Sequence, residues 1–250
     1  MPDPSHALDL PPPFRLTRLR EAGDAFAHAS AHANELGAGS LVFVGRFDIA
    51  EFAVVLEPEE PLAEARRCFY AGMTALADAL AALAPPETPI AIDWPDAIEI
   101  DAGLVGGGRL GWPRDAGEDA IPDWLVFGAM IRLVWLRSDA AAHPRATALA
   151  EEGFGIIDAG HLAEGFARHL MRAIERWQDG ELAEVEREYA ARLRPERGVV
   201  QTIGPGGDSR LEGPGRPVER LALGQALAAP SWLDPDTGEP RRRLDLAAVS

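Results

Sequence analysis

Residues 90–108 have the sequence IAIDWPDAIEIDAGLVGGG. Apolar residues alternate with polar ones on both sides of a Trp94-Pro95-Asp96 corner, which predicts two strands, a tight turn and a glycine-rich third strand. The three adjacent glycines, Gly106–Gly108, leave bare backbone, and such a strand permits the close approach of a ligand or of another chain. We therefore expect a binding surface along this strand.

The segments that flank residues 90–108 predict further helices and buried strands. Residues 17–36, 61–84, 160–178 and 181–193 have apolar side chains at helical spacing, and a short helix is also compatible with 145–151. Residues 41–44, 52–56 and 124–136 are apolar runs rich in β-branched and aromatic side chains, which favours strands. The fold class predicted is α+β, with a mixed, mainly antiparallel sheet flanked by helices.

Proline, glycine and short strands mark the expected domain boundaries. Three prolines at 11–13 end a flexible lead, residues 1–14. After about residue 195 the pattern changes to short strand-like pieces between glycine and proline turns, closed by residues 223–228 and Trp232. We accordingly divide the chain into the lead, a main domain at 15–194 and a small C-terminal β-rich domain at 195–250.

Composition excludes several classes of function. The 24 basic residues are all arginine, the 40 acidic residues give a net charge of −16, and this field repels nucleic acid and anionic membranes. The single cysteine, Cys68, excludes an internal disulfide and a cysteine-based zinc site. The start of the sequence does not resemble a signal peptide, and no apolar run reaches the roughly 18 residues that a membrane helix needs. A cytoplasmic location is expected.

The corner and the glycine strand carry a family resemblance. Trp94-Pro95-Asp96-Ala97, followed by Val105-Gly106-Gly107, resembles the central signature of the biotin/lipoate A/B protein ligase family, in a divergent bacterial branch. In that family a sheet backed by helices carries a Trp-Pro-Asn-Asp corner, then a lysine, then a strand of small residues. Leu104 stands here where that lysine would be. The order of expected elements also agrees over about residues 15–240.

The resemblance implies a two-step reaction, in which an acid is joined to AMP and its acyl group then passes to a lysine of a carrier domain. That chemistry needs cations where negative charge develops. Leu104 supplies none, the 250 residues contain no lysine, and the loop from Gly45 to Glu51 offers only Arg46 in place of an arginine-rich nucleotide loop. Standard ATP-dependent ligation is therefore not expected, and whether the chain is an enzyme stays open.

The expected ligand site combines the corner, the glycine strand and nearby charges. Aromatic and glycine positions would line the pocket, two arginines would face a carboxylate, and an aspartate would orient the ligand. The residues assigned to it are Arg46, Asp48, Trp94, Pro95, Asp96, Gly106, Gly107, Gly108 and Arg109. The resemblance implies biotin, lipoate, an octanoyl group or an acyl-adenylate as ligand, or a biotinyl or lipoyl carrier protein as partner. Glu99 and Asp101 are expected on an exposed strand face.

Other candidate sites are weaker. His28 and His32 have metal-binding spacing, but only Asp24 and Glu35 accompany them, so no metal site is assigned. Cys68, expected inside a helix, is typical of an inert buried thiol rather than an acyltransferase nucleophile. Two further functions stay open: a divergent active acyl-protein ligase or transferase that uses arginines, and a non-catalytic interaction or assembly factor. Without lysine, the chain is not itself a biotinyl or lipoyl carrier.

Overall fold

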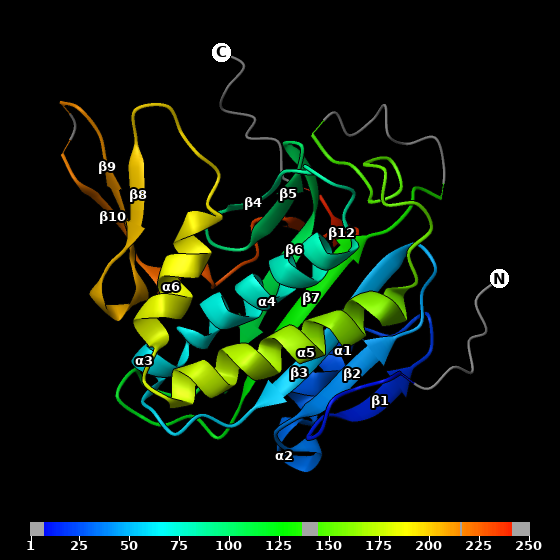
Figure 1. Cartoon of the computed structure of the whole chain (residues 1–250). Coiled ribbons are helices and arrows are strands. Elements are labelled where there is room, and N and C mark those ends of the chain that lie inside the picture. The colour runs from blue at the N-terminus through cyan, green and yellow to red at the C-terminus, as the bar shows by residue number, and fades with distance from the viewer. Residues whose placement is uncertain (1–7, 137–144, 216, 242–250) are drawn as a thin grey trace.

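The computed structural model describes residues 8–136, 145–215 and 217–241. Its centre is a seven-stranded sheet with the strand order β1-β2-β3-β7-β6-β5-β4 (Figure 1). The strands are β1 (Arg15–Leu19), β2 (Ser40–Val44), β3 (Ile49–Leu56), β4 (Ile90–Asp93), β5 (Ala97–Ile100), β6 (Gly103–Gly111) and β7 (Leu125–Arg132). β1 and β2 are parallel, and the other neighbouring pairs are antiparallel. The predicted mixed, mainly antiparallel sheet is confirmed.

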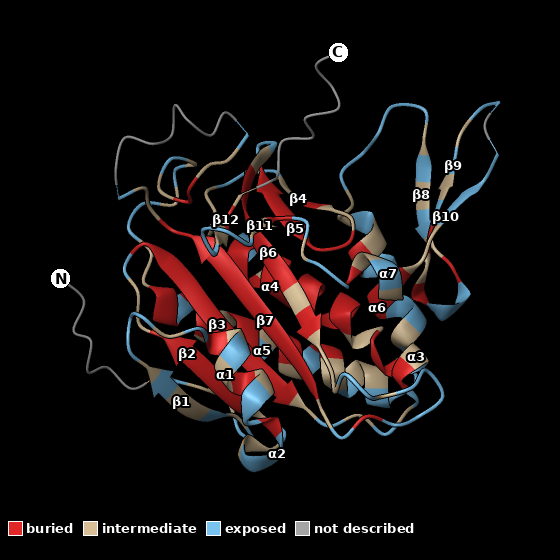
Figure 2. Cartoon of the chain, turned by 180° about the vertical axis from the view of Figure 1, so that it is seen from behind, coloured by how far each residue is buried: buried red, intermediate tan, exposed pale blue. Residues whose placement is uncertain are grey.

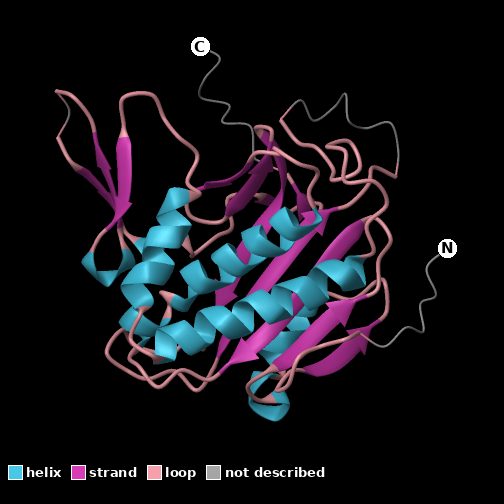
Figure 3. Ribbon diagram, viewed as in Figure 1, coloured by secondary structure: helices cyan, strands magenta, loops and turns pink. Residues whose placement is uncertain are grey.

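Two long helices, α4 (Cys68–Leu83) and α5 (Ala159–Gln178), lie side by side over one face of this sheet (Figures 1 and 3). Between them and the sheet lies the main core, in which the rings of Phe127 and Phe166 stack with centroids 5.5 Å apart. The short helix α3 (Leu62–Ala65) precedes α4, and α6 (Leu182–Ala191) contacts α4. This face is therefore closed by apolar packing.

The opposite face, which Figure 2 shows, carries the short helix α1 (Ala25–Ala31), and α2 (Ala33–Leu36) follows it. Asp24 caps α1, because its carboxylate accepts a hydrogen bond from the Ala27 N–H at 2.8 Å. A second, smaller core lies between the alanines of α1 and valines of β2, β3 and β7. A third cluster lies further along the same face and consists of Ile49, Ala97, Leu104, Met130 and Trp232.

The C-terminal part contains two small sheets. A three-stranded sheet is formed by β8 (Val200–Ile203), β9 (Ser209–Glu212) and β10 (Glu219–Leu221), with the one-turn 3-10 helix η2 (Pro205–Gly207) between β8 and β9. The helix α7 (Leu223–Ala226) follows, and then a two-stranded hairpin of β11 (Leu233–Asp234) and β12 (Glu239–Pro240). Trp232 was expected to close the small β-rich domain. It packs instead on the main sheet, because Gly107 leaves room there for the indole.

Several expected boundaries are corrected. The helix expected at 17–36 begins only at Ala25, and residues 15–19 form the edge strand β1, whose short alternating pattern the alanine-rich run beside it obscures. The helix expected at 61–84 is divided into α3 and α4. Residues 145–151 form turns and a β-bridge from Ala146 to Leu104 rather than a helix, and the strand expected to reach 136 ends at Arg132.

The flexible lead expected at residues 1–14 falls partly outside the described residues. Of its described part, Leu8, Leu10 and Phe14 pack against the main core, and the Asp9 carboxylate pairs with Arg168 of α5 at 2.9 Å. Residues 8–14 are therefore attached to the domain by apolar contacts. Among the described helices, none has the length and apolar character needed to cross a membrane.

Candidate functional site

The corner between β4 and β5 is held from two sides. On one side, the Tyr189 hydroxyl of α6 donates a hydrogen bond to the Pro95 carbonyl at 2.7 Å. On the other, the Asp96 carboxylate accepts hydrogen bonds from the backbone N–H and the hydroxyl of Ser231, at 2.9 and 2.5 Å. The Asp96 carbonyl also accepts the Gly108 N–H at 2.9 Å. The corner is therefore fixed to the glycine strand β6 and to the C-terminal segment.

Asp96 is the most perturbed carboxyl of this corner. Its residue is 1% exposed, and burial raises its pKa to about 6, although both hydrogen bonds from Ser231 act in the opposite direction. The negative charge of Asp93 adds a smaller raising effect. Asp96 therefore changes protonation state near pH 6, where an ordinary aspartate is already ionised.

The C-terminal segment packs directly on the glycine strand at Gly107. A Cβ at Gly107 would lie 2.0 Å from the Asp96 carbonyl oxygen and 2.4 Å from Cδ1 of the Trp232 indole. Trp232 is fully buried, and its Nε1–H donates to the Gly108 carbonyl at 2.8 Å. The bare backbone expected from the sequence is thus covered by an aromatic ring of the chain itself.

The other two glycines serve different contacts. Gly106 has φ +149°, and a Cβ there would lie 1.9 Å from the Met130 carbonyl oxygen on β7. A Cβ at Gly108 would point to the helix-covered face, 2.6 Å from the Met73 sulfur. A register shift between β5 and β6 lies next to these residues. Of these three glycines, Gly107 is the one that faces the side of the sheet that carries α1, and Trp232 covers it there.

The segment 231–241, which we call the C-terminal strap, has a further anchor on β7. Arg132 donates from Nη2 to the Glu239 carboxylate at 3.1 Å and to the Pro240 carbonyl at 3.3 Å. Within the strap, the Arg241 N–H donates to the Trp232 carbonyl at 2.6 Å. β12 contacts both β6 and β7, and Figure 2 shows β11 and β12 at the same end of the sheet as β5.

Charged side chains surround the exposed part of this face. Arg46 and Asp48 form an ion pair at 2.9 Å. Burial alone would raise the pKa of Asp48, but the bond from the Arg46 guanidinium lowers it below its ordinary value. Glu51 is buried and accepts the Ala25 N–H at 2.7 Å, and burial raises its pKa.

Arg109 projects from β6 toward α1. Its guanidinium lies 4.1 Å from the centre of the Phe26 ring and 3.0 Å from the Asp24 carboxylate. Burial lowers its pKa, while Asp24 and Glu51 act in the opposite direction. Arg46 and Arg109 therefore both act electrostatically on Glu51, and each already has a carboxylate partner.

The remaining sequence candidates lie elsewhere. Trp94 packs against the main core, on the helix-covered side of the sheet, and not beside Gly107. Glu99 is buried, 3.5 Å from Arg194, so its expected exposure is wrong, whereas Asp101 is exposed in the turn before β6. The segment after α6 runs along β4, where the Arg194 N–H donates to the Ile92 carbonyl, and from there the Arg194 side chain reaches Glu99 on β5.

Cysteine and histidine provide no alternative centre. Cys68 lies at the start of α4, and burial raises the pKa of its thiol. The rings of His28 and His32 stack with centroids 4.5 Å apart. Within the described ranges, no group of three or more histidine, cysteine, aspartate or glutamate side chains is arranged to hold a metal ion.

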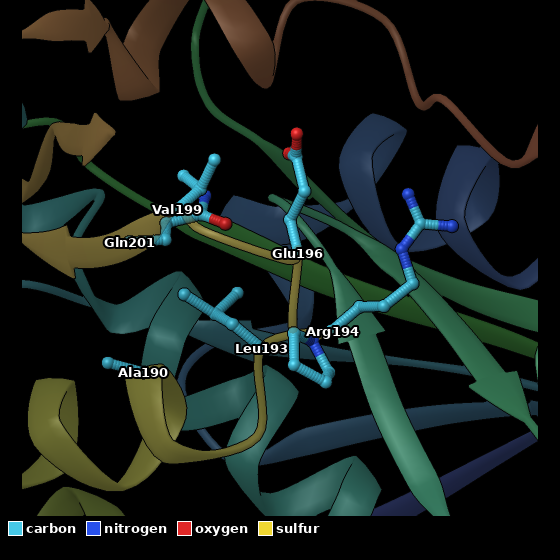
Figure 4. A pocket seen from close by; sticks show the side chains of 7 residues that line it. Ala190, Leu193, Arg194, Glu196, Val199 and Gln201 are labelled. Atoms are coloured by element: carbon cyan, nitrogen blue, oxygen red, sulfur yellow. The ribbon is translucent and has the colours of Figure 1, made fainter. Parts of the chain in front are cut away.

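Two cavities lie away from the glycine strand. The smaller has a volume of about 160 Å³ and is lined by Ala190, Leu193, Arg194, Pro195, Glu196, Val199 and Gln201. Figure 4 shows the Arg194 and Glu196 side chains extending in different directions around it. The larger, about 470 Å³, lies between α3 and the C-terminal part, next to Arg66, Trp112 and Arg220. Neither is lined by a residue of the expected ligand site.

Ser231, Trp232, Glu51 and Arg132 are site residues that sequence reasoning did not identify. Glu51 had a local signal, since it is a charged residue in the middle of an apolar strand. The only sequence signal for Trp232 was a large apolar side chain in a proline- and alanine-rich segment. This signal does not indicate which surface the side chain covers.

The fold and part of the sequence have known counterparts. A sequence profile of the biotin/lipoate A/B protein ligase family matches residues 10–191. A crystal structure of a biotin protein ligase-like protein of unknown function from Silicibacter sp. TM1040 is 31% identical, with a TM-score of 0.76, over 89% of this chain and 100% of that one. A search of curated proteins finds no match.

More distant structures share the fold alone. The biotin protein ligase from Aquifex aeolicus in complex with biotin and ATP has 14% identity and a TM-score of 0.66, over 84% of this chain and 96% of that one. The biotin protein ligase from Leishmania major in complex with biotinyl-5-AMP has 15% identity and a TM-score of 0.53, over 85% and 100%.

Proposed function

The chain belongs to the biotin/lipoate A/B protein ligase family, and we propose that it binds a biotin-, lipoyl- or octanoyl-type acyl ligand, or the carrier domain that bears one, without standard ATP-dependent ligation. The observation that carries this proposal is Leu104. It occupies the position that the family signature gives to a lysine, it is 2% exposed, and it belongs to the apolar cluster around Trp232. No cation can act from that position.

The charges of the surrounding face support the loss of adenylation. β2 and β3 are joined by only the four residues 45–48, and their single arginine is paired with Asp48. Three arginines of this face, Arg46, Arg109 and Arg132, meet four carboxylates, those of Asp24, Asp48, Glu51 and Glu239. A nucleotide triphosphate is a polyanion, so this arrangement does not stabilise the charge that develops during adenylation.

The surface next to Leu104 suits an apolar acyl group. Ala97 and Met130 line it with apolar side chains, and Gly107 contributes bare backbone that the Trp232 ring covers in this structure. The Gly108 carbonyl and the Asp96 carboxylate provide hydrogen-bond acceptors at its edge. Arg109 of β6 lies on this face, and we propose that its guanidinium binds the carboxylate of the free acid.

Two measurements test the proposal. Calorimetric titration of the full chain with biotin, lipoate and octanoate is expected to show binding of at least one acid. Incubation of that acid with ATP and Mg²⁺ is expected to release no pyrophosphate above background. ATP-dependent pyrophosphate release, or transfer of the acyl group to a carrier domain, would show instead that the chain is a divergent active ligase.

A variant at Arg109 tests the assigned orientation. Arg109→Ala is expected to weaken binding of the free acid about tenfold, the loss of one charged hydrogen bond, and to leave binding of its methyl ester unchanged. Arg187→Ala is the matched control, because Arg187 is also paired with a carboxylate, that of Glu184 at 3.1 Å, but lies on the surface of α6. Equal weakening for acid and ester would contradict the assignment.

A further inference from the structure

The C-terminal strap, residues 231–241, occupies the surface that the proposed ligand would use. Trp232 lies over Gly107, and its indole N–H takes the Gly108 carbonyl as acceptor. Ser231 takes both oxygens of the Asp96 carboxylate, one through its backbone N–H and one through its hydroxyl. The apolar floor and both acceptors of the site are thus already engaged by the chain itself.

These contacts use the groups that a bound acyl ligand would use. A fully buried flat ring lies against bare backbone, and its single polar atom is satisfied by that backbone. Gly107 is matched to this ring, because a Cβ would come within 2.5 Å of the indole nitrogen. A ligand and the indole cannot occupy this space together, since the two would overlap.

The strap is also separable from the rest of the fold. Trp232 belongs to a five-residue cluster that shares no member with the main core between the sheet and the helices. Residues 235–238, between the two strands of the hairpin, are exposed. Release of the strap would therefore leave the main core and the seven-stranded sheet in place.

We propose that the C-terminal strap is an intramolecular competitor for the acyl-ligand site, in which Trp232 fills the ligand's place and an acyl ligand or its carrier displaces it. This inference rests on the proposed function. A tethered competitor lowers the apparent affinity by the fraction of molecules in which the site is open. Removing the indole should therefore tighten ligand binding rather than weaken it, which is the reverse of what loss of a binding residue would do.

The test is calorimetric titration of the full-length chain and its variants with biotin, lipoate and octanoate. Trp232→Ala is expected to bind at least one of these acids ten or more times tighter than the unaltered chain. Ser231→Ala, which keeps the indole and changes an exposed residue, is expected to tighten binding about threefold to fivefold. It keeps the inference testable if Trp232→Ala does not fold.

Matched controls remove similar groups far from the strap. Trp177→Ala removes a partly buried tryptophan of α5, and Thr88→Ala removes a hydroxyl that donates one hydrogen bond, to the Pro85 carbonyl at 2.9 Å. Both are expected to bind like the unaltered chain. Hydrogen exchange provides a second measurement, because ligand binding should accelerate exchange of the Ser231 and Arg241 amides.

The outcomes separate the two proposals. Equal affinities in all chains, or ligand binding that leaves the strap amides as protected as before, would overturn the competitor role and leave the proposed function standing. Absence of binding in every chain, Trp232→Ala included, would overturn the proposed function and the competitor role with it. Tighter binding confined to the two strap variants would support both.

Discussion

Gly107→Ala is the substitution that most directly tests the packing of the strap on the sheet. The added Cβ would lie 2.0 Å from the Asp96 carbonyl oxygen and 2.4 Å from the Trp232 ring, whereas ordinary contact begins at about 3.4 Å. The Asp96 carbonyl is held by the Gly108 N–H, so it cannot withdraw by more than 1 Å without breaking that bond. The substitution therefore forces both the corner and the strap to move.

The size of the effect follows from three contributions. Overpacking of a rigid site costs about 1–3 kcal/mol. The hydrogen bonds from Gly108 to Asp96 and from Trp232 to Gly108 contribute about 1 kcal/mol each, and both are lost or weakened. We expect the free energy of unfolding to fall by about 3–5 kcal/mol, which most domains of this kind can lose and still fold.

Urea unfolding followed by circular dichroism measures this difference. Gly117→Ala is the matched control, because an added Cβ there meets nothing within 4 Å among the described residues, and we expect a change below about 0.5 kcal/mol. Gly108→Ala should lie between the two, since its nearest neighbour is the flexible Met73 side chain. A Gly107→Ala chain whose free energy of unfolding lies within about 1 kcal/mol of the unaltered chain would refute the close packing of Trp232 on Gly107.

Two further substitutions test the Trp94-Pro95-Asp96 corner. Because the pKa of Asp96 is raised to about 6, the stability that it contributes is complete below about pH 4 and is lost as the pH rises through 6. Asp96→Asn should remove about 3 kcal/mol of this pH dependence. If the urea midpoint changed by the same amount between pH 4.5 and pH 8 in the variant and in the unaltered chain, this expectation would be contradicted. Tyr189→Phe removes the hydrogen bond to the Pro95 carbonyl and should lower the free energy of unfolding, measured in urea at pH 7, by about 1–2 kcal/mol. An unchanged urea midpoint would show that this bond contributes nothing to stability.

Local patterns predicted those parts of the fold whose partners are also local. The pattern of residues 90–108 predicted β4, β5 and β6, which pair consecutively, and apolar periodicity predicted α4 and α5. β1 was missed because it pairs with β2 across the whole of α1 and α2, and five alternating residues beside an alanine-rich helix carry a weak signal. The sequence placed Glu99 on an exposed face, since nothing near it indicates that Arg194 covers that strand.

For the candidate site too, the sequence predicted features with a local pattern but not contacts between distant residues. The corner and the glycines were identified, because proline and consecutive glycines are unusual in strands. The partner of Gly107 was not identified, because the contact with Trp232 joins residues more than a hundred positions apart. The three glycines also looked equivalent in the sequence, although the alternation of side chains along a strand turns Gly108 to the opposite face from Gly107.

The order of strands in the sheet has a consequence for synthesis of the chain. β3 pairs with β7 along its full length, yet β4, β5, β6 and two helices are made between them. At roughly 5–20 residues per second, β3 therefore waits for several seconds on the ribosome with the backbone N–H and C=O groups of one edge unpaired. During that interval its only available neighbour is β2, so the N-terminal half of the sheet is the part of the nascent chain most exposed to aggregation and to chaperone binding.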